Sequence, residues 1–461
     1  MINRRTLTKS LGAALAISAT GTVPATADTT EHSKRGRYLI RGGAVVTVDQ
    51  ALGVLPRADV LIDDGKIAAV GRDLDARGAK IVDATDMIVM PGFVNTHHHM
   101  WSAIGRNYVA DGFPYFAAKR ATSLLYEAKD VYRSVLLGLA ELANAGVTTV
   151  HNWSNNTRSP AHADAELRAH RDGLLRARFS YGHVDQMPRD VPMDLTDVDR
   201  VRQQYFSQGS AFDGLVHLGI NLRGLSQSTE PAFIADMEAA LGRGLPIAIH
   251  AGQAPPRIVD AADYERRGWL GPKTLLCHYI TALPSDMEIM ARTGTPLSWA
   301  PHSEYRLGTG GQKEALLGFR AAGVVVSLSS DATSIAPSDM FETMRLIPEA
   351  GFRGSLEMAT INGARALGLG GVTGSITVGK RADVILVRTN DINLAPGGLF
   401  ETTLVQAATP ANVDTVFSDG RMVKRGGRLV AYDVDRIVRD AQTSSLRIRT
   451  AAGGILTPPA N

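Results

Sequence analysis

The sequence predicts an α/β protein that combines a (β/α)₈ barrel of the TIM type with a small β-sandwich. Apolar runs alternate with helical stretches between residues 91 and 373, which is the pattern of βα units. Short strands separated by Gly- and Asp-containing turns occupy residues 37–90 and return at residues 374–435, which predicts one sandwich built from both ends of the chain. A doubly wound open sheet is the alternative, but the first strand lacks the Gly-rich phosphate loop of such sheets.

Residues 1–28 resemble an export signal. A twin-arginine motif at Arg4 and Arg5 precedes a moderately apolar stretch, and a small-residue A-x-A cleavage pattern ends at Ala27. The apolar stretch is too short and too rich in Gly, Ser and Thr to span a membrane. We therefore expect export to the periplasm or the medium and exclude the leader from the fold. The alternative is a cytosolic enzyme whose leader is never cleaved.

The elements of both domains follow from the hydrophobic pattern. The β-sandwich is expected from eight short segments, at residues 38–40, 44–48, 60–62, 67–70, 374–376, 382–387, 413–417 and 421–423. The barrel strands are expected in the apolar run that leads to His97 and at residues 147–150, 179–182, 215–220, 247–249, 274–277, 295–299 and 324–328. Helices are expected at residues 131–145, 163–176, 232–242, 286–292 and 315–322, and a short helix is expected in the tail, residues 436–461.

Composition narrows the function classes. The 461 residues are 44% hydrophobic and 21% charged, which is typical of a soluble globular protein. A net charge of +3 without a basic run argues against a nucleic-acid or membrane-surface partner, so a small-molecule substrate is expected. The single cysteine, Cys277, excludes an internal disulfide and a cysteine-based zinc cluster. Histidine and carboxylate must therefore supply any metal site.

Ionisable residues follow several of the predicted barrel strands. His97 and His99 are two apart on an extended strand, so their rings point to the same side, a geometry that suits a metal ion. His250, His278 and Asp331 each directly follow a later apolar run. Since catalytic groups of such barrels lie at the C-terminal ends of the strands, we expect these five side chains to meet at the barrel mouth.

This order of residues resembles the amidohydrolase superfamily, and within it the single-metal branch that contains cytosine, guanine and adenosyl-type deaminases and triazine hydrolases. The resemblance covers nearly the whole mature chain. It extends beyond the histidines to four motifs, at residues 64–71, 82–97, 359–368 and 374–383. These motifs are specific for the superfamily and say little about the substrate.

The resemblance implies a ligand set and a reaction. His97, His99, His250 and Asp331 would hold one divalent ion, with zinc preferred and Fe²⁺ or Mn²⁺ as alternatives. His278 would polarise the substrate or orient the water, and Asp331 would accept a proton from it. The family also implies a homodimer.

The chain departs from the family in two places. The family usually has Glu three residues after the strand-five histidine, where it shuttles a proton, but this chain has Gln253, which cannot titrate. After strand seven the chain has His302 and Glu304, which either take over the acid role or are solvated loop residues.

Four other residues are candidates for contact with the substrate. His151 and His183 lie near predicted strand ends, where they would line the pocket. Trp101 either stacks on a planar ring or packs internally, and Arg106 either meets a substrate anion or pairs with a nearby carboxylate.

We therefore expect a metal-dependent hydrolase in which metal-bound hydroxide attacks a carbon of a small cyclic or heteroaromatic compound and cleaves a C–N bond, by deamination or amide hydrolysis. Gln253 keeps alternatives open. These are a hydrolase of carbamate or aryl–heteroatom bonds, and a metal-binding lyase, isomerase or binding protein.

Overall fold

A computed structural model describes residues 34–109, 114–207, 211–252, 256–307 and 310–454 of the chain. The predicted leader and Gln253 lie outside these residues. The central element is an eight-stranded parallel sheet in which each strand pairs with the next along the chain. Its strands are β6 (Phe93–His98), β7 (Val147–Ser154), β8 (Arg176–Tyr181), β9 (Val216–Leu222), β10 (Ile247–His250), β11 (Thr274–Cys277), β12 (Leu297–Trp299) and β13 (Val326–Leu328).

The sheet closes into the predicted barrel where β13 meets β6. The closure is a single parallel bridge between His98 and Asp331, just beyond the end of β13. The backbone N–H of Asp331 donates to the carbonyl of His97 at 3.1 Å, and the N–H of His99 donates to the carbonyl of Asp331 at 2.8 Å. The barrel therefore closes at residues that the sequence predicted as metal ligands.

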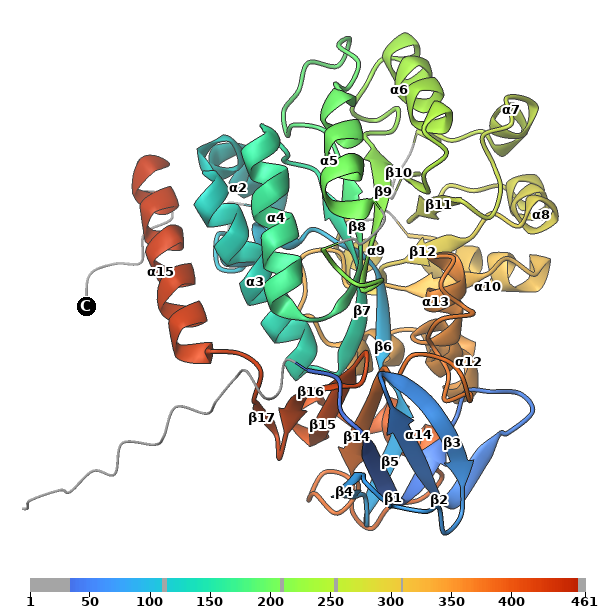
Figure 1. Ribbon diagram of the computed structural model, residues 1–461. Helices are drawn as coiled ribbons and strands as arrows, with labels where there is room; N and C mark the ends of the chain where they lie inside the picture. The colour runs from blue at the N-terminus through green and yellow to red at the C-terminus, as the bar shows by residue number, and fades with distance from the viewer. Residues whose placement is uncertain (1–33, 110–113, 208–210, 253–255, 308–309, 455–461) are drawn as a thin grey trace, which may run out of the picture.

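Helices surround the barrel (Figure 1). All five predicted helices are present, as α3 (Ala128–Asn144), α4 (Pro160–Gly173), α6 (Glu230–Gly242), α8 (Pro284–Thr293) and α10 (Gln312–Ala322). Sequence analysis missed α2 (Tyr115–Thr122), α5 (Thr196–Phe206), α7 (Ala261–Arg266), α9 (Pro301–Leu307), α11 (Met340–Arg345), α12 (Phe352–Met358), α13 (Ile361–Ala366) and α14 (Phe400–Gln406). The predicted short tail helix is a long one, α15 (Val434–Ala451), which packs beside α3. In the described part of the chain, no helix has the length and apolarity needed to cross a membrane.

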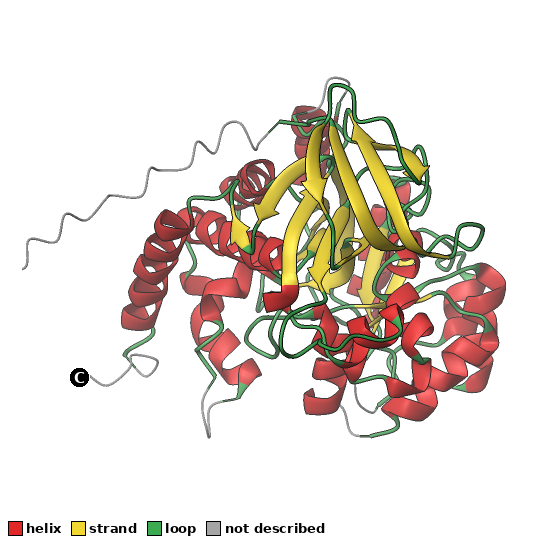
Figure 2. Ribbon diagram, turned by 90° about the horizontal axis from the view of Figure 1, so that it is seen from below, coloured by secondary structure: helices red, strands yellow, loops and turns green. Residues whose placement is uncertain are grey.

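The two ends of the chain form one β domain, as predicted, in which blue N-terminal strands lie beside orange and red C-terminal strands (Figure 1). The strands of this domain face the viewer in Figure 2. Its strands belong to a single nine-stranded hydrogen-bonded sheet, in which β5 pairs antiparallel with β14 and so joins the N-terminal and C-terminal segments. The predicted strand at residues 374–376 is irregular, since Gly374 adopts a φ of +88°. The strands are β1 (Tyr38–Val46), β2 (Val54–Asp63), β3 (Lys66–Gly71), β4 (Lys80–Asp83), β5 (Met87–Pro91), β14 (Val384–Arg388), β15 (Val413–Ser418), β16 (Arg421–Arg425) and β17 (Arg428–Leu429).

The chain passes from the β domain into the barrel through Pro91 and Gly92. A Cβ atom on Gly92 would lie 2.2 Å from the Thr148 side chain, so only glycine allows this close approach between β6 and β7. The backbone N–H of Gly92 donates to the carbonyl of Asp383 at 2.9 Å. This junction places β6, and with it His97 and His99, in a fixed position relative to the β domain.

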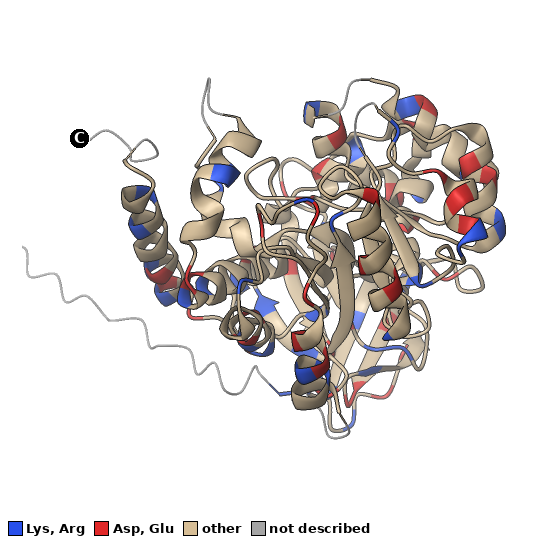
Figure 3. Cartoon of the chain, turned by 90° about the horizontal axis from the view of Figure 1, so that it is seen from above, with Lys and Arg blue, Asp and Glu red and all other residues tan. Residues whose placement is uncertain are grey.

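A buried cluster of arginines around Asp419 links the two domains a second time. The Asp419 carboxylate accepts hydrogen bonds from Arg176 of β8 at 2.9 Å, from Arg35 at 2.6 Å, and from Arg381 and Arg421. Burial raises the pKa of Asp419, but the hydrogen bond from Arg381 and the positive charge of Arg176 outweigh it and lower that pKa to about 2. Along the outer helices, positions of Lys and Arg alternate with positions of Asp and Glu (Figure 3).

This cluster predicts an acid-dependent loss of stability. The pKa of Asp419 is lower in the folded chain, so its contribution of about 2 kcal/mol is present above pH 4 and is lost as the pH falls through about 2. Asp419→Asn leaves buried guanidinium groups without their charge partner. We expect it to lower the free energy of unfolding at pH 7 by about 3–5 kcal/mol in urea titrations.

The matched control is Asp75→Asn, because Asp75 pairs with Arg77 on the exposed surface of the same domain. This variant should unfold at the same urea concentration as the wild type. An Asp419→Asn variant as stable as the control at pH 7 would contradict the role assigned to the cluster.

Candidate metal centre

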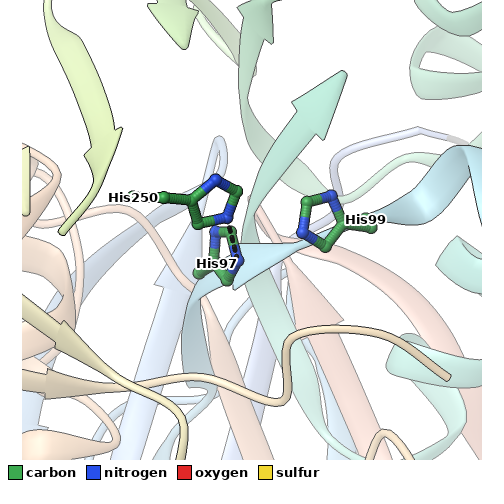
Figure 4. Close-up of side chains that lie close together, drawn as sticks. All are labelled: His97, His99 and His250. Carbon is green, nitrogen blue, oxygen red and sulfur yellow. Dashed lines mark hydrogen bonds between the residues drawn. The ribbon is translucent and has the colours of Figure 1, made fainter. Parts of the chain in front are cut away.

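Three imidazoles converge at the C-terminal ends of β6 and β10 (Figure 4). Nε2 of His97 lies 3.3 Å from Nε2 of His250, and the two rings are nearly perpendicular. Nε2 of His97 and Nε2 of His99 lie 3.4 Å and 3.3 Å from the same oxygen, Oδ1 of Asp331. The four predicted ligands are thus within reach of one ion.

Each ligand has a feature of local structure that aims it. His97 and His99 are two apart along the strand, whereas His98 turns to the other side and contacts the Ser330 hydroxyl through Nδ1 at 3.0 Å. The indole of Trp153 packs beside His250, with ring centroids 4.1 Å apart. Asp331 adopts a φ of +59°, a left-handed conformation that is costly for a non-glycine residue and recurs at functional sites.

The protonation states of these residues fit a metal ion, which binds neutral imidazole and ionised carboxylate. Burial lowers the pKa of His97, His99 and His250, so each ring is neutral near pH 7. Burial raises the pKa of Asp331, but the surrounding imidazoles outweigh it and hold that pKa well below its usual range. Three nitrogens and one carboxylate oxygen are a donor set that suits zinc and related ions.

An amide oxygen fixes the tautomer of His99. Oδ1 of Asn155 lies 2.7 Å from Nδ1 of His99 and accepts the indole N–H of Trp101 at 2.6 Å. Since this oxygen can only accept, Nδ1 of His99 carries the proton and the lone pair of Nε2 faces the metal position. Trp101 is buried, so it packs internally, which is one of the two roles that the sequence left open, and it positions Asn155 behind the predicted ligand His99.

A second carboxylate holds His278, the predicted catalytic histidine. Oε1 of Glu304 lies 3.1 Å from Nδ1 of His278 and accepts the backbone N–H of Ala300 at 2.9 Å. Burial lowers the pKa of His278, but Glu304 and Asp331 outweigh it and raise that pKa. On the other side of the ring, Nε2 of His278 lies 3.9 Å from Oδ2 of Asp331. Glu304 thus acts on the site through His278 and is fully buried, not a solvated loop residue.

The site opens into a cavity of about 600 Å³. His99, His250, His278 and Asp331 lie on its wall, which places the predicted metal centre next to space that a small molecule can fill. The lining also includes apolar side chains and two cations: Tyr115, Phe116, Leu225, Ile258, Leu307, Lys119 and Arg189.

Two predicted substrate contacts lie away from the cavity. His151 is fully buried, with Nδ1 2.8 Å from the Thr96 carbonyl and Nε2 2.8 Å from the Ser180 hydroxyl. Sequence analysis ended this strand at residue 150, but β7 continues to Ser154, so His151 lies within the barrel and not at its mouth. Arg106 pairs with Glu141 at 2.5 Å. Of the two partners expected from the sequence, it therefore meets a nearby carboxylate.

His302 and His183 also lie outside the main cavity lining. His302 is 5% exposed, and its Nε2 lies 4.0 Å from Glu342. His183 lines a smaller chamber that adjoins the main cavity. Sequence analysis missed Asn155, Lys119 and Arg189, because an amide and two cations in loops and a short helix give no periodic signal.

Comparison with protein-family models gives one match, the Amidohydrolase family, over residues 88–423. The chain belongs to the amidohydrolase family. This confirms the predicted superfamily and the predicted enzyme class, a metal-dependent hydrolase that acts on C–N bonds. The matched residues contain the whole barrel and all four predicted ligands.

Curated relatives match over nearly their full length. The chain is 29% identical to a 5-methylthioadenosine/S-adenosylhomocysteine deaminase of Desulforudis audaxviator, with 89% of this chain and 99% of the relative covered. It is 27% identical to a 5'-deoxyadenosine deaminase of Methanosarcina acetivorans, with 88% of this chain and 97% of the relative covered.

Solved structures share the fold of this amidohydrolase. An adenosine deaminase from Xanthomonas campestris with bound zinc superimposes with a TM-score of 0.78 at 21% identity, over 90% of this chain and 99% of that one. An atrazine chlorohydrolase from Arthrobacter aurescens in complex with zinc superimposes with a TM-score of 0.74 at 20% identity, over 88% of this chain and 100% of that one.

The geometry predicts which histidines the metal requires. His97→Ala and His250→Ala each remove one of four converging donors, so the purified variants should retain less than about a tenth of the wild-type metal content by plasma mass spectrometry. The control is His217→Gln, since His217 lies on β9 outside the cluster. Equal metal in the His97→Ala variant and in this control would show that the ion binds elsewhere.

Proposed function

We propose that this amidohydrolase is a zinc enzyme that removes an amino group from a small heteroaromatic ring, with water as co-substrate and ammonia as the leaving group. The observation that carries the proposal is the convergence of three neutral imidazoles and one ionised carboxylate, of which His99, His250 and Asp331 lie on the wall of a 600 Å³ cavity. The deaminases among its relatives support this reaction, and the zinc in two structural neighbours supports the metal.

The residues His97, His99, His250 and Asp331 would hold the ion, which supplies Lewis acidity that makes water nucleophilic near pH 7. Oδ2 of Asp331 lies 3.9 Å from Nε2 of His278, where it is placed to accept a proton from the attacking water. Because Glu304 accepts from Nδ1, the ring of His278 is held with Nε2 toward the reacting centre. His278 then donates a hydrogen bond that polarises the ring atom next to the attacked carbon.

Hydrolysis of a different bond, with loss of a group other than ammonia, is the second candidate function. Gln253 favours it, because ammonia departs only after protonation and an amide side chain cannot deliver that proton. A carbamate or an aryl–heteroatom bond has a leaving group that needs less protonation. His278 supported by Glu304 is the proton donor that would allow deamination in spite of Gln253.

The test is ammonia release by the zinc-loaded protein from a panel of amino-substituted rings: adenine, guanine, cytosine, melamine and the nucleosides of the first three. We expect release from at least one compound. Asp331→Asn should abolish it, and Glu304→Gln should lower kcat by about 10–100-fold with KM changed less than about twofold, because it acts through His278 and not on the substrate.

Glu349→Gln is the matched control for Glu304→Gln, since Glu349 is outside the cavity lining and pairs with Lys313. It should retain full activity. Absence of ammonia release from every compound, with metal bound, would contradict deamination and favour the second candidate. A rise in KM without a fall in kcat for Glu304→Gln would contradict the role given to His278.

A further inference from the structure

Two side chains of β7 point away from the metal centre, toward the outer helix α4. Side chains alternate along a strand. Trp153 faces the barrel interior, where it packs beside His250, whereas Asn152 and Ser154 face outward and contact Glu166 of α4. A group outside the barrel is therefore connected to the metal centre through the end of β7.

Glu166 accepts two hydrogen bonds, one from each of these outward side chains. The Ser154 hydroxyl donates to Oε1 at 2.5 Å, and Nδ2 of Asn152 donates to Oε2 at 2.6 Å. Nδ2 of Asn152 also lies 2.9 Å from Nε2 of His170, one turn further along α4. All four side chains are fully buried. The contact between β7 and α4 is thus a polar network inside an otherwise apolar barrel wall.

The carboxylate of Glu166 is buried without a cation beside it, as far as the described residues extend. Burial raises the pKa of Glu166 to about 7, and the hydrogen bonds from Ser154 and Asn152 oppose this rise. A buried carboxylate without a cation is costly to keep, and groups of this kind gather at functional sites. Above pH 7 the carboxylate is ionised and can only accept, so it fixes both neighbours as donors.

Ser154 begins the short segment that reaches the metal centre. The next residue, Asn155, faces the opposite way, and its Oδ1 lies 2.7 Å from Nδ1 of His99. The turn between them is tight, because the backbone N–H of Asn155 donates to the carbonyl of Trp153 at 3.0 Å. A displacement of Ser154 therefore moves the amide that fixes the tautomer of His99.

We propose that Glu166 is a positioning residue for the metal centre. By holding Ser154 it fixes the Asn155 amide, and through that amide it sets the orientation of His99 and the affinity for zinc. The inference rests on the zinc site of the proposed function and extends it to a helix outside the barrel. Partners behind a metal ligand commonly change metal affinity by about 10–100-fold.

The test is the dissociation constant for zinc at pH 8, measured by competition between the zinc-free protein and a fluorescent chelator. In Glu166→Gln the amide N–H₂ group faces a donor whichever way it turns, either the Ser154 hydroxyl or the Asn152 amide. We expect the dissociation constant to rise about tenfold. Ser154→Ala removes the bond between Glu166 and the segment without removing the carboxylate, and it should raise the constant similarly.

Two double variants separate positioning from a general loss of stability. Adding Asn152→Asp to Glu166→Gln exchanges donor and acceptor, so the pair is complementary again and the constant should return to within about twofold of the wild type. His170 can follow this exchange, because its Nδ1 has no partner among the described residues and the ring can change tautomer. Adding Glu166→Gln to Asn155→Ala should change the constant by less than about twofold, since the path to the ligand is already broken.

The matched control is Glu238→Gln, because Glu238 is an exposed carboxylate on α6. Asp419→Asn is the control for lost stability. Both should keep the wild-type zinc affinity, and thermal unfolding confirms that each variant is folded.

Wild-type affinity in Glu166→Gln and Ser154→Ala overturns the inference while the metal centre stands. So does a failure of Asn152→Asp to restore affinity, or an undiminished effect of Glu166→Gln beside Asn155→Ala. Absence of zinc binding by the wild-type protein contradicts the metal centre itself.

Discussion

The structure depends on one short set of hydrogen bonds, those by which Asp331 closes the barrel against β6. Its backbone N–H and C=O bond to residues 97 and 99, and its carboxylate lies between the imidazoles of the same two residues. The hydrogen bonds that close the barrel therefore also place the Asp331 carboxylate between the two imidazoles. At Asp331 the backbone has a positive φ, and with this conformation one residue both bonds to β6 and points its carboxylate at the imidazoles.

Neighbouring side chains orient the predicted ligands and the catalytic histidine in turn. Asn155 and Trp101 fix the tautomer of His99, and Glu304 fixes the orientation of His278. These neighbours are buried and held by backbone or side-chain hydrogen bonds, so the donor atoms are oriented before any ligand binds. Such orientation matters because a metal centre tolerates only small displacements of its donors.

The convergence of the predicted ligands could be predicted from sequence because they follow apolar strands, and the strand ends of a closed barrel meet at one mouth. The same rule failed for His151, since β7 continues to Ser154 and the polar run after Val150 hid the true strand end. The ion pair between Lys119 of α2 and Asp185 of the loop after β8 could not be predicted either. Their contact joins a short helix to a loop about 66 residues later, and only the tertiary fold brings them together.

The central claim is that three imidazoles and one carboxylate, with no thiolate, bind the metal ion. X-ray absorption spectroscopy of the zinc-loaded protein measures this directly. We expect a first shell of nitrogen and oxygen at about 2.0–2.1 Å, with the multiple scattering of about three imidazoles. A sulfur shell at about 2.3 Å, which only Cys277 or a methionine can supply, or a shell without imidazole scattering, would contradict the account.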